Sequence, residues 1–88
     1  MVKHTLRRVI GHNVKQQREL FRYTQAHVAE EAGISQTTLS NVEAGKAGLE
    51  LESAVRIARL FGCDVGDLAS PNFMFRMQDE KKDRKAAS

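Results

Sequence analysis

Between Thr24 and Gly45 the sequence alternates residues that start helices with glycines that end them. Thr24 and Ser35 are good N-cap residues, because their hydroxyls can accept hydrogen bonds from the exposed amides of a helix's first turn. Gly33 and Gly45 can adopt the left-handed conformation that ends a helix, since glycine has no Cβ. The pattern predicts two helices of about two turns each, joined by a tight turn at Gly33: residues 25–32 and 36–43.

Helical periodicity predicts three further helices around this pair. The first runs from Thr5 to Phe21, with Thr5 as its cap and apolar residues at helical steps: Leu6, Val9, Ile10, Val14 and Phe21. Another runs from Glu50 to Phe61 with a broad stripe expected to be buried: Leu51, Ala54, Val55, Ile57, Ala58 and Phe61. After Gly62, Asp64 can cap a short helix over residues 65–69. The expected fold class is therefore all-α, with five helices.

The chain has 88 residues, enough for one small domain but not for a multi-step enzyme with a deep pocket. We expect residues 1–70 to form this domain and residues 71–88 a C-terminal extension. A single cysteine, Cys63, excludes an intramolecular disulfide and any zinc site built on paired cysteines. Because no apolar run approaches the roughly 20 residues of a membrane span, we expect a cytoplasmic protein without a membrane partner.

Positive charge is concentrated at the start of the chain. Residues 1–22 contain six Lys and Arg residues and one Glu, a net charge of +5, although the whole chain is only +3. Residues 50–75 carry two arginines and four acids, a net charge of −2. The small net charge of the whole chain favours a polyanion partner only weakly. The distribution of charge along the sequence is the more informative feature.

The two short helices and their glycine turn have the geometry of a helix-turn-helix, whose second helix enters the DNA major groove. Ala29 lies where the helices cross, and Leu39 and Val42 anchor the second helix to the core. The other side chains of residues 36–43 are mostly polar and uncharged. A merely solvated helix usually carries Lys and Glu, which have higher helix propensity, so this surface favours contact with DNA.

The sequence resembles the Cro/CI phage-repressor type of helix-turn-helix, often called XRE-like, over residues 9–69. The resemblance rests on four segments: residues 10–18, Thr24-Gln25-Ala26-His27-Val28-Ala29, Gly33-Ile34-Ser35-Gln36-Thr37-Thr38-Leu39-Ser40 and Glu43-Ala44-Gly45-Lys46. It implies a compact phage-repressor-like domain that binds double-stranded DNA.

The resemblance also implies roles for individual residues. It implies base reading by Gln36, Thr37, Ser40 and Asn41, and phosphate contact by Thr24, Gln25, Thr38 and Lys46. The chemistry agrees, because Gln and Asn can bond adenine in a bidentate manner and the Thr methyl can touch thymine. In that family Arg18 would pair with Glu43, a structural ion pair rather than a DNA contact.

Two charged or apolar segments outside the motif have alternative interpretations. Lys3, Arg7 and Arg8 form either an arm that grips phosphate or a solvated helix face, and both stay open. Residues 73–77 alternate in a strand-like manner and are too apolar to leave in water. They either fold back on the chain's own core or pair with a second chain; the favoured interpretation is dimerisation through Phe73, Phe75 and Met77. Residues 78–88 are predicted to be a charged, flexible tail.

The remaining reactive residues favour structural roles. His4, His12 and His27 are expected at the surface, because only Glu31 is placed to join His27 as a metal ligand. Cys63 is expected to be buried rather than redox-sensing. No catalytic or cofactor arrangement has suitable spacing, so we expect no enzyme activity, no cofactor and no metal.

Together these features predict a sequence-specific transcriptional regulator, such as a repressor, that binds a palindromic operator as a homodimer with half-sites about one helical turn apart. Bound protein would block or recruit polymerase. The alternative is a protein-interaction module, either an antitoxin or a coactivator-like domain, that uses the same scaffold to bind a toxin or RNA polymerase. Weak, salt-sensitive DNA binding without sequence preference would indicate this alternative.

Overall fold

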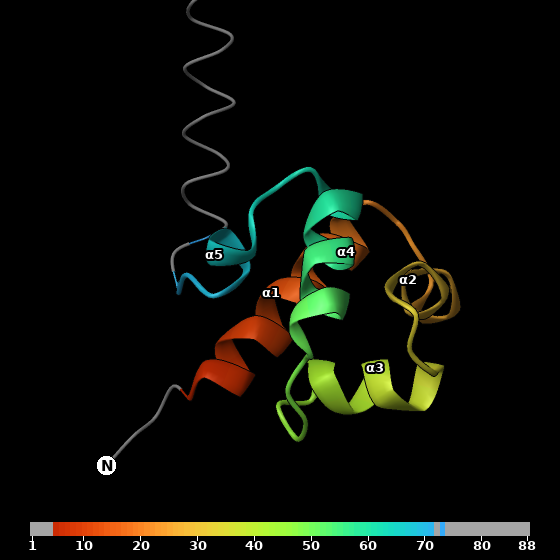
Figure 1. Cartoon of the computed structure of the whole chain (residues 1–88), viewed down its shortest axis with the longest axis horizontal. Helices are drawn as coiled ribbons and strands as arrows, with labels where there is room; N and C mark the ends of the chain where they lie inside the picture. Colours follow the sequence, from red (N-terminus) through yellow and green to blue (C-terminus); the bar gives the residue numbers. More distant parts are fainter. Residues whose placement is uncertain (1–4, 72, 74–88) are drawn as a thin grey trace, which may run out of the picture.

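The computed structural model describes residues 5–71 and 73, which contain five α-helices and no strand (Figure 1). The helices follow one another along the chain: α1 (Leu6–Leu20), α2 (Gln25–Ala32), α3 (Gln36–Glu43), α4 (Leu51–Phe61) and α5 (Val65–Leu68). The all-α prediction is confirmed, and α2 and α3 have the predicted bounds. The other three helices differ from prediction only by terminal residues.

The helix ends follow the local signals in the sequence. The hydroxyls of Thr5, Thr24 and Ser35 each accept a hydrogen bond from the backbone N–H three residues later. Gly33 and Gly45 have φ angles of 75° and 77°, in the left-handed region predicted for both. These caps and turns fix the lengths of α2 and α3 without any contribution from the core.

The helix pair α2 and α3 is held by two other helices. Helix α3 packs against both α1 and α2, and α4 packs against α2, while the short α5 closes against α1 and α4. Figure 1 shows α3 along one edge of the molecule and α5 at the opposite side of α1. The arrangement leaves one side of α3 without a covering helix.

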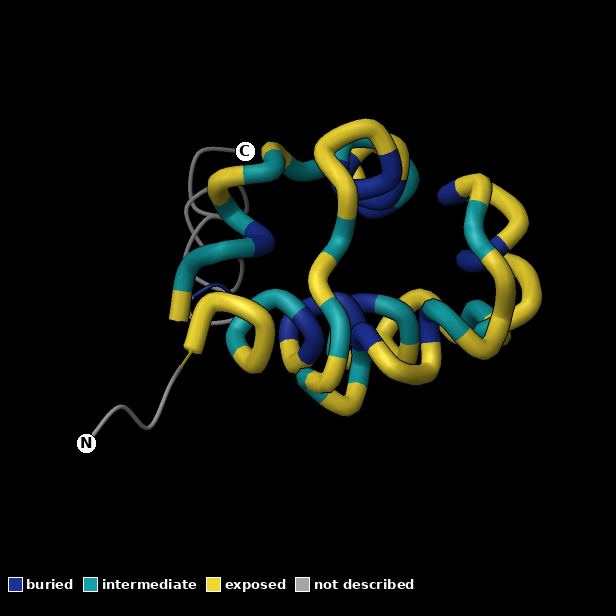
Figure 2. The backbone as a smooth tube through the Cα atoms, turned by 60° about the horizontal axis from the view of Figure 1, so that its bottom comes forward, coloured by how far each residue is buried: buried dark blue, intermediate teal, exposed yellow. Residues whose placement is uncertain are grey.

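The core is formed by side chains that pack between these helices, and Figure 2 marks the buried positions along the backbone in dark blue. Its buried apolar cluster joins all five helices: Val14, Val28, Ala29, Ala32, Leu39, Ile57, Ala58, Phe61, Leu68 and Phe73. Ala29 is buried as predicted for the helix crossing, and Leu39 and Val42 are fully buried. The two anchors therefore fix which face of α3 points outward.

Gly11 sets the distance between α1 and α3. A Cβ at this position would overlap the backbone carbonyl oxygen of Val42 and would lie 3.2 Å from the backbone oxygen of Glu43. Two helix backbones can come this close only where one of them lacks a side chain. The contact brings the C-terminal end of α3 against the first half of α1.

Asn13 ties α1 to the end of α5. Its side-chain Nδ2 donates to the backbone oxygens of Leu68 and Ser70, at 2.7 and 2.8 Å, and the residue is buried. These carbonyls lie at a helix end, where no intrahelical donor is available. One buried amide thus satisfies two carbonyls from the C-terminal part of the domain.

Replacing Asn13 with alanine is expected to lower the free energy of unfolding by about 2 kcal/mol, because two buried carbonyls lose their donor. Urea denaturation measures this change. Asn41→Ala is the matched control, since Asn41 is exposed on α3, and it should change stability by less than ~0.5 kcal/mol. Equal effects of the two substitutions would contradict the anchoring role of Asn13.

Several predictions about apolar residues need correction. Leu51 was expected in the buried stripe of α4 but is 72% exposed, because it is the first residue of the helix and lies beyond the packed surface. Leu6, the first residue of α1, and Phe21, which follows its last residue, are exposed too, although only their helical spacing was predicted. Glu50 has an extended backbone and precedes α4 as its N-cap instead of starting the helix.

Phe73 lies in the chain's own core, with only 1% of its surface exposed. Its backbone is helical, so the strand-like prediction is wrong at this residue. Phe73 therefore follows the fold-back interpretation and not the favoured dimer contact. Phe75, Met77 and the predicted tail lie outside the described residues. Among the described helices, none is long and apolar enough to cross a membrane.

Candidate nucleic-acid interface

The uncovered side of α3 presents the residues predicted to read bases. Gln36, Thr37, Ser40 and Asn41 are all exposed, while Leu39 and Val42 on the opposite side are fully buried. Thr38 is half-buried, and its hydroxyl oxygen accepts from the Ser35 hydroxyl at 2.8 Å. The exposed side of α3 therefore offers amide and hydroxyl groups and carries no charge.

The start of α2 contains two of the predicted phosphate contacts. Thr24 is exposed, and its hydroxyl accepts from the backbone N–H of His27 at 3.1 Å. The Gln25 side chain is turned inward, where its Nε2 donates to Glu43 Oε1 at 3.0 Å. The backbone N–H groups of the first turn have no intrahelical acceptor, and the helix dipole makes this end attractive to an anion.

Lys46 lies in the loop that follows α3. Its backbone N–H donates to the carbonyl oxygen of Asn41 at 2.9 Å, which folds the loop back against the end of α3. The side chain of Lys46 is exposed. A cation is thereby held next to the last of the exposed polar residues of α3.

Arg18 and Glu43 form a partly buried, two-point ion pair between α1 and α3. Arg18 Nε donates to Glu43 Oε2 at 2.7 Å and Nη2 donates to Oε1 at 3.1 Å, while Nη1 donates to the backbone oxygen of Tyr23 at 3.0 Å. The hydrogen bond to Glu43 raises the pKa of the Arg18 guanidinium above its ordinary value. The structure brings the two residues together as expected and adds Tyr23 and Gln25 to their network.

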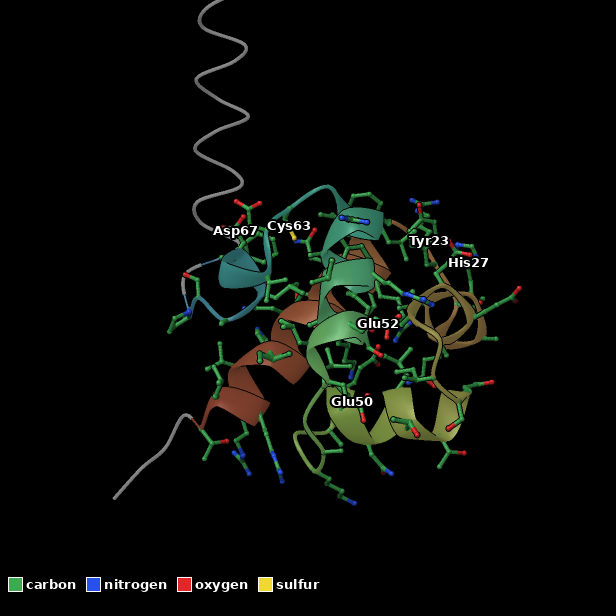
Figure 3. All side chains as sticks on the ribbon, viewed as in Figure 1. Tyr23, His27, Glu50, Glu52, Cys63 and Asp67 are labelled. Carbon is green, nitrogen blue, oxygen red and sulfur yellow. The ribbon has the colours of Figure 1, made fainter. Side chains whose placement is uncertain are left out.

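The described histidines do not gather with other metal ligands. His12 and His27 are exposed, and the ring of His27 packs against Tyr23 with centroids 4.8 Å apart (Figure 3). Within residues 5–71 and 73, no three His, Cys, Asp or Glu side chains are placed to hold a metal ion.

Cys63 is half-buried just beyond α4, on the side of α5 (Figure 3). Burial raises the pKa of its thiol to about 11, and the negative charges of Asp67 and Asp64 contribute to the same shift. Because the thiolate is the reactive form, these surroundings oppose redox chemistry at neutral pH.

Cys63 is expected to react with iodoacetamide about tenfold more slowly in the folded protein than in urea at pH 8. A pKa raised from 9.0 to about 11 lowers the thiolate fraction roughly 100-fold. A thiolate with a higher pKa is intrinsically more nucleophilic, which offsets about tenfold of that loss. The rate should keep rising with pH until about 11. A plateau reached near pH 9 would contradict the shift.

Two structural contacts of α1 could not be predicted from the sequence. Gly11 carries no sequence signal of its closeness to Val42, since both helices are regular there. In the sequence, Asn13 cannot be distinguished from the other polar residues of an amphipathic helix. Its burial depends on α5, which lies 55 residues further along the chain.

Comparison with known structures supports this fold. The crystal structure of the clp gene regulator ClgR from Corynebacterium glutamicum is similar with a TM-score of 0.73 and 22% identity, covering 94% of this chain and 92% of that chain. A hypothetical transcription factor, NHTF from Neisseria, is similar with a TM-score of 0.71 and 24% identity, covering 84% of each chain. No curated protein matches the chain.

A third similar structure has a different character. FeII HppE in complex with substrate gives a TM-score of 0.64 and 29% identity, but this chain covers only 37% of it. The likeness is therefore confined to a minor part of that protein. The Helix-turn-helix family HTH_3 matches residues 14–68, which contain the four helices α2 to α5 entirely. With its two short capped helices, glycine turn and outward polar face, the chain belongs to the HTH_3 helix-turn-helix family.

Proposed function

We propose that the protein is a sequence-specific regulator of transcription that binds double-stranded DNA as a homodimer on a palindromic operator. The observation that carries the proposal is the uncharged polar surface of α3, with Gln36, Thr37, Ser40 and Asn41 exposed above two fully buried anchors. The family match supports DNA binding. The structural similarity to ClgR, a clp gene regulator, and to NHTF, a hypothetical transcription factor, supports a role in regulation.

In the proposed mechanism α3 enters the major groove, where each base pair presents a distinct pattern of donors and acceptors. Gln36 and Asn41 carry both a donor and an acceptor, which suits the N6 and N7 atoms of adenine. The methyl group of Thr37 suits the methyl group of thymine, and the Ser40 hydroxyl can donate or accept. Their roles as base-reading residues are part of this proposal.

Register on the duplex comes from contacts to phosphate, which carry no sequence information themselves. The backbone amides at the start of α2, around Thr24 and Gln25, take one phosphate, and Lys46 takes another. Thr38 contributes its hydroxyl from the edge of α3. Buried anchors and the Arg18–Glu43 pair keep these groups in one rigid arrangement.

A second copy of the chain supplies the specificity that one small reading surface lacks. A single α3 contacts only a few base pairs, whereas two copies related by a two-fold axis read an inverted repeat. Because Phe73 is in the chain's own core, the proposed dimer contact within residues 73–77 rests on Phe75 and Met77.

Selection of bound sites from a random duplex pool tests the proposal. An enriched inverted repeat, bound at least ~10³-fold more tightly than scrambled DNA at about 0.15 M salt, is the expected result. Sedimentation of the protein on the enriched site should give two chains per duplex. A pool without enrichment would reject sequence-specific binding and favour the protein-interaction alternative, with a toxin or RNA polymerase as the partner to seek.

Gln36→Ala and Lys46→Ala are expected to separate base reading from phosphate contact. The first should cost about 1–3 kcal/mol on the selected site and relax the preference at one base pair. The second should weaken binding to all sequences alike and lower the salt slope by about one. Equal losses on specific and random DNA for Gln36→Ala would remove its reading role.

A further inference from the structure

The helix-turn-helix segment carries little positive charge of its own. Residues 24–46 contain one cation, Lys46, and three glutamates, a net charge of −2. Most of the affinity of a protein for duplex DNA comes from cations that neutralise phosphates and release counterions. Besides Lys46, the cations that attract DNA must therefore lie on elements outside this segment.

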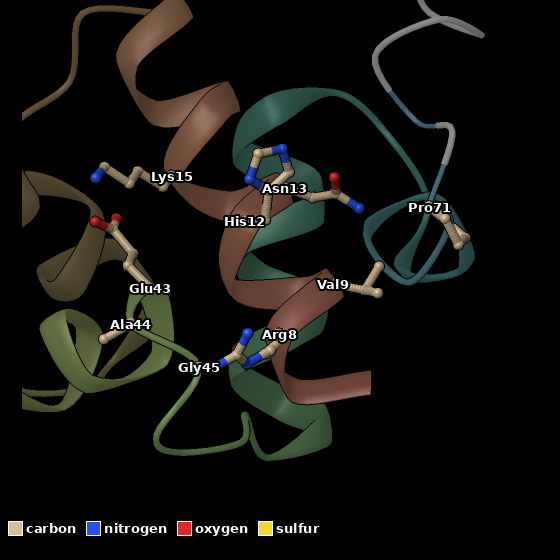
Figure 4. Close-up of a pocket in the computed structure, with 9 residues that line it drawn as sticks. All are labelled: Arg8, Val9, His12, Asn13, Lys15, Glu43, Ala44, Gly45 and Pro71. Atoms are coloured by element: carbon tan, nitrogen blue, oxygen red, sulfur yellow. The ribbon is translucent and has the colours of Figure 1, made fainter. Parts of the chain in front are cut away.

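A positively charged groove lies directly beside the end of α3 (Figure 4). It has a volume of about 730 Å³ and runs between α1 and the loop after α3. On one side are Arg8, His12 and Lys15, which share one face of α1 because they are four and three residues apart. On the other side are Ala44 and Gly45, which come immediately before Lys46.

The charges of this groove are available to a ligand. Arg8, His12 and Lys15 are exposed, and within the described part of the chain neither Arg8 nor Lys15 forms an ion pair. The one carboxylate in the groove belongs to Glu43, whose oxygens already accept from Arg18 and Gln25 and whose side chain is only 4% exposed. The groove therefore keeps a net positive charge.

We propose that this α1 groove, formed by Arg8, His12 and Lys15, binds the phosphate backbone of DNA that flanks the half-site read by α3. The inference rests on the proposed function and extends its contact surface from the α3 loop onto α1. The Arg8 side chain packs against the loop, since its Cγ is 3.0 Å from the position a Cβ would take on Gly45. Lys46 and Arg8 thus belong to one continuous edge of the protein. The phosphate backbone that borders the major groove can run along this edge.

The salt dependence of binding to a random-sequence duplex tests the groove directly. Arg8→Gln combined with Lys15→Gln keeps an uncharged polar side chain at both positions but removes two charges, and should lower the slope of log K against log salt by about 2. Arg56→Gln combined with Arg59→Gln is the matched control, because it makes the same charge change on the exposed face of α4. The control should keep the wild-type slope, as should Arg8→Lys with Lys15→Arg. Thermal unfolding of each variant verifies that the fold is intact.

A second measurement locates the contact on the DNA. Neutral methylphosphonates placed just outside the selected half-site should weaken binding of the wild type, whereas the Arg8→Gln/Lys15→Gln variant should be indifferent to them. An unchanged salt slope for this variant, or an equal decrease of the slope in the α4 control, would overturn the proposal that the groove binds DNA. In a third outcome, the wild-type protein selects no DNA site, yet the Arg8→Gln/Lys15→Gln variant still shows a lower salt slope. That result would reject the proposed function and leave the groove as a non-specific DNA contact.

Discussion

Glu43→Ala is expected to lower the free energy of unfolding by about 3–5 kcal/mol. The substitution leaves the Arg18 guanidinium, with only 14% of its side chain exposed, without its carboxylate partner, and it removes the acceptor of the Gln25 amide. A charge that is largely removed from water and has lost its partner recovers only part of the hydration it gave up on folding. For a domain of this size the melting temperature should fall by about 12 °C or more, which calorimetry or thermal circular dichroism measures.

The exposed pair between Arg56 and Glu52 provides the matched control. Its atoms are 2.9 Å apart, yet the two side chains are 50% and 76% exposed, so Glu52→Ala should cost less than ~0.5 kcal/mol. Combining Glu43→Leu with Arg18→Met should recover most of the stability lost in Glu43→Ala, because it removes both charges together. Similar losses for Glu43→Ala and Glu52→Ala would show that the Arg18 network does not hold α1 to α3.

Gly11→Ala is expected to destabilise the fold by about 3 kcal/mol, the upper end of the cost of overpacking. The new Cβ would meet backbone atoms of Val42 and Glu43, which cannot turn aside as the end of a flexible side chain can. Helix propensity alone predicts the opposite sign, since alanine favours a helix over glycine by about 1 kcal/mol. The sign of the change in urea denaturation therefore decides between the local and the tertiary effect.

Gly66→Ala is the control for this substitution. Gly66 lies in α5, and a Cβ there has nothing within 4 Å, so the exchange should be neutral or stabilising by up to about 1 kcal/mol. Because Gly11 positions the end of α3, Gly11→Ala should also weaken binding to the selected site more than binding to random DNA. A Gly11→Ala protein as stable as Gly66→Ala would refute the close approach of α1 and α3.

The helix-turn-helix could be predicted from the sequence because the residues that define its helix ends act locally. A cap hydroxyl bonds an amide three residues away, and a glycine ends a helix through its own φ angle, so Thr24, Gly33 and Ser35 specify their elements without reference to the core. The same locality made the exposed side of α3 predictable, since Leu39 and Val42 are the only large apolar residues in that helix.

Predictions that depended on which side chains meet were less successful. Leu51 belongs to an apolar stripe by spacing, but no other element reaches the first residue of α4, so it remains exposed. Phe73 looked like a contact for a second chain, because the sequence could not show that the chain's own core has room for its ring.

The sequence by itself determined the number and limits of the helices in the motif, the turn between them and the polar side that α3 exposes. Only the tertiary structure decided the approach of Gly11 to Val42, the anchoring of α5 by Asn13 and the groove between α1 and the loop at Gly45. The physical reason is range. Caps and periodicity act within one or two turns of helix. These contacts instead join residues 31 to 57 positions apart, and whether such residues meet depends on how the intervening helices pack.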